Sequence, residues 1–319
     1  DHAMRMRFIP ILTAFFALCL ILSGCGGKAE DWERLYKDTG ERLAAQDAPS
    51  VGSVGGEWLV VGLARSGMLS DEAAASYLEN AEEYVQSIGS DRLHPVKSTE
   101  NSRLILGITA AGGDPTDIGG YDLLRGLADA DYIRAQGTNG PIWALIAFDC
   151  GDYPIPEEGD LSRENLVGDI LSLQCTDGGW GFFGDTSDVD MTAMALQSLA
   201  PYREDEKVQT AAEKALRFLS LSRTADGGYE SGGVQNCESC AQVIVALCSL
   251  GIDPQKDEDF LKNGHSVIEA LCGFATEENT FCHQKDKPQT DAMATEQAYY
   301  ALTAYHRYKS GMTSLYDMR

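Results

Sequence analysis

The sequence predicts an all-α protein, an α6/α6 toroid in which six pairs of helices close into a two-layer ring. Three observations support this fold. Beyond residue 30, apolar residues recur with a helical period almost everywhere, and no run of residues alternates as a strand would. A two-part unit repeats, in which a glycine-rich loop leads into an apolar helix that is paired with an amphipathic one. The 33 glycines include two Asp-Gly-Gly-aromatic tracts, ending at Trp180 and Tyr229, which mark the clearest copies of this loop.

The start of the chain has the pattern of an export signal. Arg5 and Arg7 supply positive charge, residues 8–22 form an apolar run that is short for a membrane span, and Cys25 follows Leu-Ser-Gly. This order resembles the lipobox of bacterial lipoproteins, which implies cleavage before Cys25 and lipidation of its sulfur. An ordinary signal peptide with an accidental cysteine is the alternative interpretation.

The predicted domain organisation follows from this signal. Residues 1–24 form the signal peptide, with a vector-derived scar before the first Met, residues 25–30 form a lipidated linker, and residues 31–319 form a single toroid domain. We expect the protein to be exported and held on the outer face of the cytoplasmic membrane through lipid chains on Cys25.

The elements of the ring are predicted from their periodicity. Six apolar helices form the inner wall, at about 59–64, 104–110, 142–148, 194–199, 242–250 and 298–305. Six amphipathic helices form the outer layer, at about 32–46, 70–88, 121–135, 163–173, 206–222 and 257–272. The polar residues that begin each inner helix then point into one end of the central cavity, where a functional site is expected.

Composition excludes several partners. Lys and Arg number 25 against 49 Asp and Glu, which gives a formal net charge of −24. So few basic residues offer no broad cationic face, and nucleic acid is therefore not expected as a partner. Anionic lipids should repel the chain, so a membrane is expected as a partner only through the lipid anchor.

The cysteines leave three interpretations open. Cys19 falls in the signal peptide and Cys25 takes the lipid, so seven remain in the domain, and an odd number cannot all pair within one chain. They are buried free thiols, or include disulfides, or contribute a zinc site in which Cys237-x-x-Cys240 is joined by Cys282-His283. The spacing is loose for zinc, so we predict no metal and no cofactor.

Two motifs carry a family resemblance. Gln174 and Trp180, within Gln-Cys-Thr-Asp-Gly-Gly-Trp, resemble the QW repeat of terpenoid cyclases, and Asp226-Gly-Gly-Tyr229 resembles the matching loop of protein prenyltransferase β-subunits. The chain is also similar to the α-domain of transcobalamin and to prenyltransferase-like repeat lipoproteins on the surface of Gram-positive bacteria. The resemblance spans nearly the whole domain and implies the α6/α6 toroid.

The resemblance implies two chemistries that can be compared residue by residue. In class II terpene cyclases an Asp-x-Asp-Asp motif protonates the substrate, and the matching stretch implies Asp190 as general acid and Asp188 as its supporting carboxylate. Met191 replaces the third carboxylate, and an N-cap with a first-turn acid is the alternative interpretation of the two aspartates. The catalytic zinc triad of prenyltransferases is not matched, because the corresponding helix start reads Cys237-Glu238-Ser239 and the later one, Met293-Ala294-Thr295, carries no His. A separate prenyltransferase α-subunit is therefore not expected.

Binding is the function that the sequence favours. We expect a small hydrophobic or amphipathic molecule, or a protein partner, at the central cavity, with a terpene cyclase-like activity as the alternative. Polar helix starts and aromatic side chains supply the candidate ligand-binding residues, for which helix capping and helix packing are the competing interpretations. The candidates are Glu57, Trp58, Asn139, Trp143, Trp180, Tyr229, Glu238, Gln242 and Gln297.

Overall fold

A computed structural model describes residues 31–319. The predicted signal peptide, Cys25 and the linker lie outside the described residues. Within 31–319, no helix combines the length and the apolar character needed to cross a membrane.

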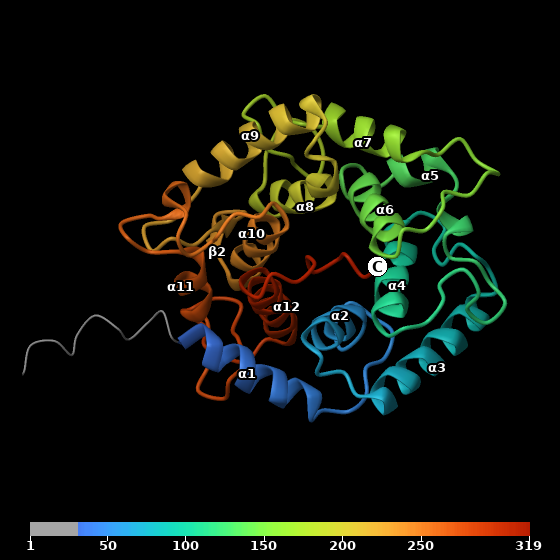
Figure 1. Ribbon diagram of the computed structural model, residues 1–319, viewed down its shortest axis with the longest axis horizontal. Helices are drawn as coiled ribbons and strands as arrows, with labels where there is room; N and C mark the ends of the chain where they lie inside the picture. The colour runs from blue at the N-terminus through green and yellow to red at the C-terminus, as the bar shows by residue number, and fades with distance from the viewer. Residues whose placement is uncertain (1–30) are drawn as a thin grey trace, which may run out of the picture.

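The described residues form the predicted α/α toroid (Figure 1). The inner ring consists of α2 (Glu57–Ser66), α4 (Thr99–Ala110), α6 (Asn139–Cys150), α8 (Val189–Leu199), α10 (Cys237–Ser249) and α12 (Ala292–Lys309). The outer ring consists of α1 (Asp31–Ala44), α3 (Asp71–Ile88), α5 (Ala130–Arg134), α7 (Arg163–Ser172), α9 (Glu206–Leu221) and α11 (Val267–Cys272). Each inner helix contacts the next one, and α12 contacts α2, so the inner ring is closed.

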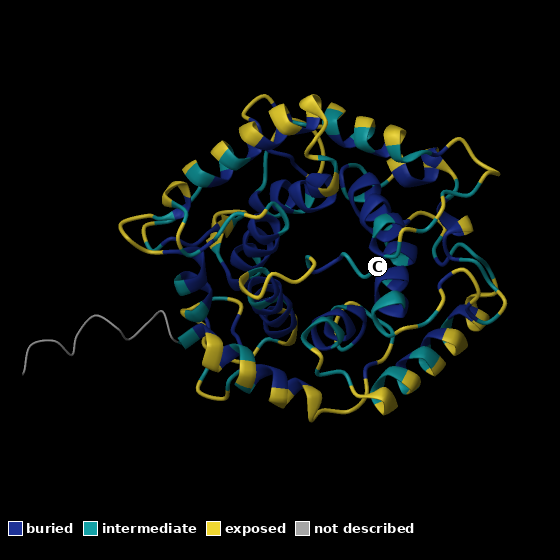
Figure 2. Ribbon diagram, viewed as in Figure 1, coloured by how far each residue is buried: buried dark blue, intermediate teal, exposed yellow. Residues whose placement is uncertain are grey.

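Burial separates the two rings, as the hydrophobic pattern predicts (Figure 2). Helix α6 is buried continuously from Gly140 to Phe148, because it faces the centre of the ring on one side and the outer helices on the other. Helix α9, by contrast, buries only five residues, which lie on one face. An amphipathic helix packed on one side only is the expected outer element.

Two outer helices are shorter than predicted. In place of a helix over 121–135, the structure has a 3₁₀ turn at Arg125–Leu127 followed by α5, which begins where the side chain of Asp129 accepts from the Tyr132 amide. In place of a helix over 257–272, it has a 3₁₀ turn at Glu258–Phe260 and then α11. Asn263 and Gly264 between them have positive φ angles of 53° and 79°, which a right-handed helix cannot contain.

The Asp-Gly-Gly loops owe their sequence to close packing against the next outer helix or loop. Gly178 has a φ of 94°, and a Cβ added there would lie 2.7 Å from the Lys214 carbonyl oxygen. Gly227 has a φ of 81°, and its Cβ would lie 2.6 Å from the carbonyl oxygen of His265. A side chain at either position would be both strained and blocked. After the second loop a two-stranded hairpin, β1 (Glu230–Ser231) and β2 (Val234–Gln235), was not anticipated from the sequence.

The ring has two different ends, which are defined by the direction of the inner helices. The mouth is the end at which the six inner helices begin. The closed end is where they finish, and there residues 310–319, called the tail, run across the centre (Figure 1). Leu315 and Tyr316 of the tail are buried in the core of the ring, and the amide of Met318 donates to the Cys150 carbonyl at 2.9 Å.

Two arginines hold the tail in place. The guanidinium of Arg65 donates to the carbonyl oxygens of Leu315, Ser314 and Asp317 at 2.8–2.9 Å. Arg307 donates to the Thr313 carbonyl at 2.8 Å and to its hydroxyl at 3.0 Å. Because Arg65 lies in the last turn of α2 and Arg307 in the last turn of α12, the tail is bound where these two helices meet and close the ring.

Candidate ligand-binding pocket

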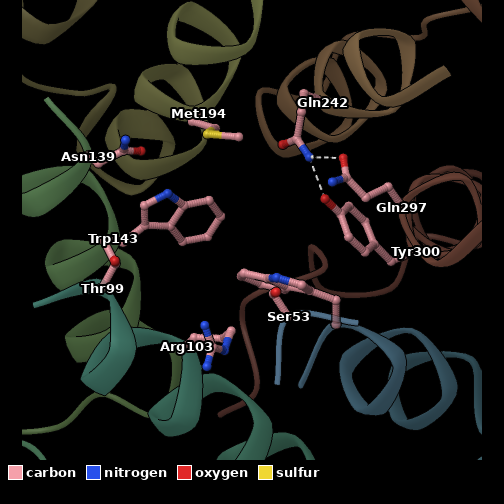
Figure 3. A pocket seen from close by; sticks show the side chains of 10 residues that line it. Ser53, Thr99, Arg103, Asn139, Trp143, Met194, Gln242, Gln297 and Tyr300 are labelled. Carbon is pink, nitrogen blue, oxygen red and sulfur yellow. Dashed lines mark hydrogen bonds between the residues drawn. The ribbon is translucent and has the colours of Figure 1, made fainter. Parts of the chain in front are cut away.

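A cavity of about 230 Å³ opens at the mouth of the ring. Its lining side chains come from all six inner helices, together with the loop before α2, and converge on one space (Figure 3). The lining residues are Ser53, Trp58, Thr99, Arg103, Asn139, Trp143, Met194, Gln242, Gln297 and Tyr300. Five of the residues predicted from the sequence are therefore brought together: Trp58, Asn139, Trp143, Gln242 and Gln297.

Aromatic rings form one wall of the pocket. The ring centroids of Trp58 and Trp143 are 5.2 Å apart at an angle of 55°, and those of Trp58 and Tyr300 are 6.1 Å apart at 54°. Behind this wall, Trp143 packs edge-on against Tyr316 of the tail, with centroids 6.0 Å apart at 83°. Tilted aromatic pairs at these distances are favourable, and they fix the rings as a rigid apolar surface.

Two glutamines line the opposite side. The side-chain amide of Gln242 donates to Gln297 Oε1 at 3.0 Å and to the hydroxyl of Tyr300 (Figure 3). Gln197, one layer deeper, donates to the backbone and side-chain oxygens of Gln242 at 3.0 and 3.1 Å. This chain of hydrogen bonds holds polar groups at the pocket surface in fixed orientations.

Glu57 lies behind the pocket lining. Its side chain is fully buried and accepts hydrogen bonds from the Tyr77 hydroxyl at 3.0 Å, the Gly52 amide at 3.1 Å and Arg103 Nε at 2.9 Å. The other guanidinium nitrogens of Arg103 donate to Glu100 at 3.1 and 2.7 Å. Burial raises the pKa of Glu57, and the charge of Arg103 opposes that rise. Glu57 thus orients Arg103, which is the side chain that reaches the pocket.

The two aspartates of the acid motif are in different environments. Asp188 is the N-cap of α8, where Oδ1 accepts from the Met191 amide at 3.0 Å and Oδ2 accepts from the Ser231 hydroxyl at 2.5 Å. Asp190 follows in the first turn, and its Oδ1 is buried without a hydrogen-bond partner among residues 31–319. Burial raises the pKa of Asp190 to about 6, with Asp188 and Glu238 adding to the rise and Ser239 and His283 opposing it. Neither aspartate lines the pocket, and the Met191 side chain is fully buried.

Two further carboxyl groups lie at the mouth. Glu238, at the start of α10, contacts His283 Nδ1 at 2.8 Å, and burial raises its pKa. Glu296 accepts from the Gly55 amide at 2.8 Å, while its Oε2 is buried and unpartnered within the described residues. Burial raises the pKa of Glu296 to about 7, a rise that the Gly55 hydrogen bond opposes and the charge of Glu57 increases.

The repeat-motif aromatics lie away from the pocket. Trp180 is fully buried between α7 and α8, where its indole nitrogen donates to the Ile170 carbonyl at 2.7 Å and its amide donates to Thr192. Gln174 of the same motif donates to the carbonyls of Gly178 and Ala211. Tyr229 is also fully buried and absent from the lining. The structure therefore places Trp180 and Tyr229 in helix packing.

Sequence reasoning missed several lining residues. Tyr300 lies three residues after Gln297, and Met194 lies four residues after Asp190, so helical spacing from the predicted residues would have found both. Arg103 had a weaker signal, namely a charged residue directly before the predicted apolar helix at 104–110, three residues after Glu100.

All seven cysteines of the described domain are free thiols, and every one except Cys272 is buried. Burial raises the pKa of Cys240 to about 12, so it remains protonated. In residues 31–319 no three His, Cys, Asp or Glu side chains are grouped so as to hold a metal ion. Of the three interpretations left open by the sequence, the structure matches the free thiols.

A second cavity, of about 520 Å³, lies at the closed end between α6, α8 and the tail. Gln197 and Tyr316 line it, so the Gln197–Gln242 and Tyr316–Trp143 contacts separate it from the mouth pocket. The centre of the ring is therefore two chambers rather than one deep cavity.

Comparison with known proteins supports the fold alone. No family model matches the chain, and no curated protein matches it significantly in sequence. Solved structures do match. A chain of Candida albicans protein geranylgeranyltransferase-I, in complex with GGPP, is 12% identical over 88% of this chain and 92% of its own, with a TM-score of 0.57.

Two bacterial enzymes have the same architecture. The type II terpene cyclase MstE from Scytonema, bound to geranylgeranyl dihydroxybenzoate, is 11% identical over 88% of this chain and 99% of its own, with a TM-score of 0.58. The unsaturated glucuronyl hydrolase from Bacillus sp. GL1 is 13% identical over 90% and 99%, with a TM-score of 0.56. The α/α toroid shared with terpenoid cyclases and prenyltransferases is thus shown. Because the same fold also carries glycan hydrolysis in the last of these proteins, it does not by itself identify an activity.

Proposed function

We propose that this protein binds a small amphipathic molecule in the mouth pocket of the toroid, while lipid chains on Cys25 hold it on the outer face of the cytoplasmic membrane. The observation that carries the binding proposal is the pocket itself. An aromatic wall of Trp58, Trp143 and Tyr300 faces the amides of Gln242 and Gln297, and all five side chains are fixed by contacts with one another. Apolar walls with a few oriented polar groups are typical of ligand sites.

The size of the pocket limits the ligand. A volume of about 230 Å³ falls below the range of roughly 300–1,000 Å³ that is usual for drug-sized molecules. The closed end adds no depth, because Tyr316 and Gln197 separate the second cavity from the pocket. The ligand, or the part of it that enters, is therefore smaller than the long prenyl chains named in the structural matches.

A pocket-filling variant tests the binding proposal. Fragments of fewer than about 15 non-hydrogen atoms, a size suited to a small site, are screened by thermal shift against three proteins: the wild type, Met194→Trp, which fills the pocket, and Leu221→Trp, which adds the same ring at a site that is 74% exposed. Fragments should stabilise the wild type and Leu221→Trp but not Met194→Trp. If no fragment stabilises the wild type, or if the hits also stabilise a folded Met194→Trp, the pocket is not a binding site.

The lipid anchor is tested separately. Cells that express the full chain are labelled with a radioactive fatty acid, and membrane and soluble fractions are compared. We expect label in the wild-type protein of the membrane fraction and none in Cys25→Ser. Equal labelling of the two proteins would contradict lipidation at Cys25.

Terpene cyclase-like chemistry is the second candidate, and one observation favours it. Asp190 has a buried, unpartnered carboxyl oxygen and a pKa of about 6, so part of the population carries a proton near neutral pH. Protonation of an alkene by Asp190, supported by Asp188, predicts cyclised products when the protein is incubated with a linear polyprene and extracts are examined by mass spectrometry. Asp190→Asn should abolish them. Product formation by Asp190→Asn, or none by the wild type, would rule out this role.

A further inference from the structure

The charged groups around the pocket show which ligands it can attract. The one cation of the lining, Arg103, is paired with two carboxylates: Nε donates to Glu57, and Nη1 and Nη2 donate to the two oxygens of Glu100. These bonds use three of the five N–H donors of the guanidinium, and the two carboxylates outweigh its single positive charge. An anionic ligand group would therefore approach Arg103 against the repulsion of both carboxylates.

The other side of the mouth adds carboxyl groups without basic partners. Asp188, Asp190, Glu238 and Glu296 lie at the starts of α8, α10 and α12, and none of them forms an ion pair with a Lys or Arg of the described chain. His283 beside Glu238 is the sole exception among ionisable partners. Together with the protein's net charge of −24, this gives the mouth a negative potential.

The aromatic wall is suited to a cation of modest size. Trp58, Trp143 and Tyr300 line the cavity, and the ring centroid of Trp58 lies 5.2 Å from that of Trp143 and 6.1 Å from that of Tyr300. The face of an aromatic ring carries partial negative charge and attracts a cation within about 6 Å, with Trp the best of the three types. Trp58 is only partly buried, so its ring is accessible from the mouth.

We propose that the mouth pocket selects a small organic cation, of the quaternary or tertiary ammonium class, over a neutral molecule of the same shape. This inference rests on the proposed binding function and specifies its ligand. The aromatic rings contact the alkyl groups of the ammonium, and the surrounding carboxylates supply the counter-charge at longer range. Arg103 does not oppose the cation, because Glu57 and Glu100 neutralise it.

A pair of isosteric probes tests the selection. Choline and 3,3-dimethylbutan-1-ol have the same shape and differ in the charge of the central atom. Their binding to the full-length protein is measured by calorimetry and by quenching of tryptophan fluorescence. Choline should bind at least roughly tenfold more tightly than the alcohol.

Two variants locate the origin of that preference. Trp58→Leu should weaken choline several-fold while changing the affinity for the alcohol less than about twofold, since an apolar wall remains. Glu100→Gln should also weaken choline, because it removes one carboxylate and leaves Arg103 less neutralised. Tyr308→Leu, an aromatic outside the pocket, is the control and should change neither affinity.

The outcomes separate this inference from the function on which it rests. Equal affinity for the two probes, or preference for the alcohol, would overturn cation selection but leave the pocket a binding site. If neither Trp58→Leu nor Glu100→Gln weakens the binding of choline, the cation binds elsewhere, and the inference is overturned as well. Phosphatidylcholine vesicles, compared with phosphatidylglycerol vesicles, distinguish the source of the cation: competition with choline indicates a lipid headgroup, and its absence indicates a free ammonium compound.

Discussion

The mouth and the closed end of the ring are built from the same six helices, but their charged side chains differ in kind and in how they are hydrogen-bonded. At the closed end, Arg163 pairs with Asp149 at 2.7 Å, and Arg65 and Arg307 donate to backbone carbonyls of the tail. At the mouth, Asp190 and Glu296 each keep a buried oxygen without a partner in the described chain. Because the inner helices all run in one direction, their dipoles favour carboxylates at the mouth and arginines at the closed end.

This difference fits the proposal that the mouth binds a ligand and that the closed end has a structural role. Buried polar groups in proteins are normally hydrogen-bonded, so unpaired carboxyl oxygens lower stability and call for an explanation. At the closed end the arginines fix the tail. At the mouth the unpaired carboxyl oxygens belong to Asp190 and Glu296, near the starts of α8 and α12, and the proposed ligand offers an explanation for them.

The largest expected effect comes from removing Glu57, the fully buried carboxylate of the mouth. Glu57→Ala leaves Arg103 and the Tyr77 hydroxyl without their buried acceptor, and removing one member of a buried pair costs about 3–5 kcal/mol. The free energy of unfolding in urea measures this loss. Glu100→Ala is the matched control, because its side chain is 23% exposed and its loss should cost about 1 kcal/mol or less. Equal losses in the two variants would contradict the central role of Glu57.

The corresponding change at the closed end concerns packing rather than charge. Tyr316→Ala removes a ring that is 8% exposed and packed on Trp143, at a cost of about 3 kcal/mol. Tyr316→Phe keeps the ring and removes a hydroxyl that has no partner among residues 31–319, so it should change stability by less than about 1 kcal/mol. Urea unfolding compares the two. A loss in Tyr316→Phe as large as in Tyr316→Ala would mean that the hydroxyl, not the ring, holds the tail.

The residues at the two ends of the ring also show how much of the structure could be predicted from the sequence. The helical period and the glycine loops predicted the ring, because both are local properties repeated along the chain. They predicted Trp143 and Gln242 in the pocket, because each lies near the start of an inner helix. For Trp180 they left ligand binding and helix packing open, since a motif does not show which way its side chain points. The insertion of Tyr316 was likewise hidden, because the tail has no periodic pattern and one of its two partners, Arg65, is distant in sequence.

The third prediction concerns a substitution at the mouth, Glu296→Gln, that should raise the free energy of unfolding rather than lower it. The pKa of Glu296 is about 7 in the folded protein, above its ordinary value of 4.5. The folded state therefore holds the proton more tightly than the unfolded state, and wild-type stability is lost as the pH rises from about 4.5 to about 7. Glu296→Gln does not ionise and should be more stable than the wild type by about 2 kcal/mol at pH 8, and by much less at pH 4.5.

Urea unfolding at both pH values measures this difference, and Glu72→Gln, on the exposed side of α3, is the control. The Glu72 variant should follow the wild type at both pH values. A Glu296→Gln variant whose advantage is the same at pH 4.5 and pH 8 would show that Glu296 is not held protonated by its surroundings.

The smallest effect concerns Asp188, for which capping and catalysis make different predictions. As the N-cap of α8, Asp188 accepts from the Met191 amide, and a cap replaced by Ala costs about 1 kcal/mol. Asn keeps the accepting oxygen, so Asp188→Asn should retain most of the stability that Asp188→Ala loses. Thermal unfolding measures both variants, with Asp205→Ala and Asp205→Asn at the cap of α9 as the matched pair on the outer ring. If Asp188→Asn is as unstable as Asp188→Ala while the Asp205 pair behaves as a cap, then the negative charge at position 188 is what the mouth requires. The aspartate would then belong with the carboxyl groups around the pocket rather than with the helix that it begins.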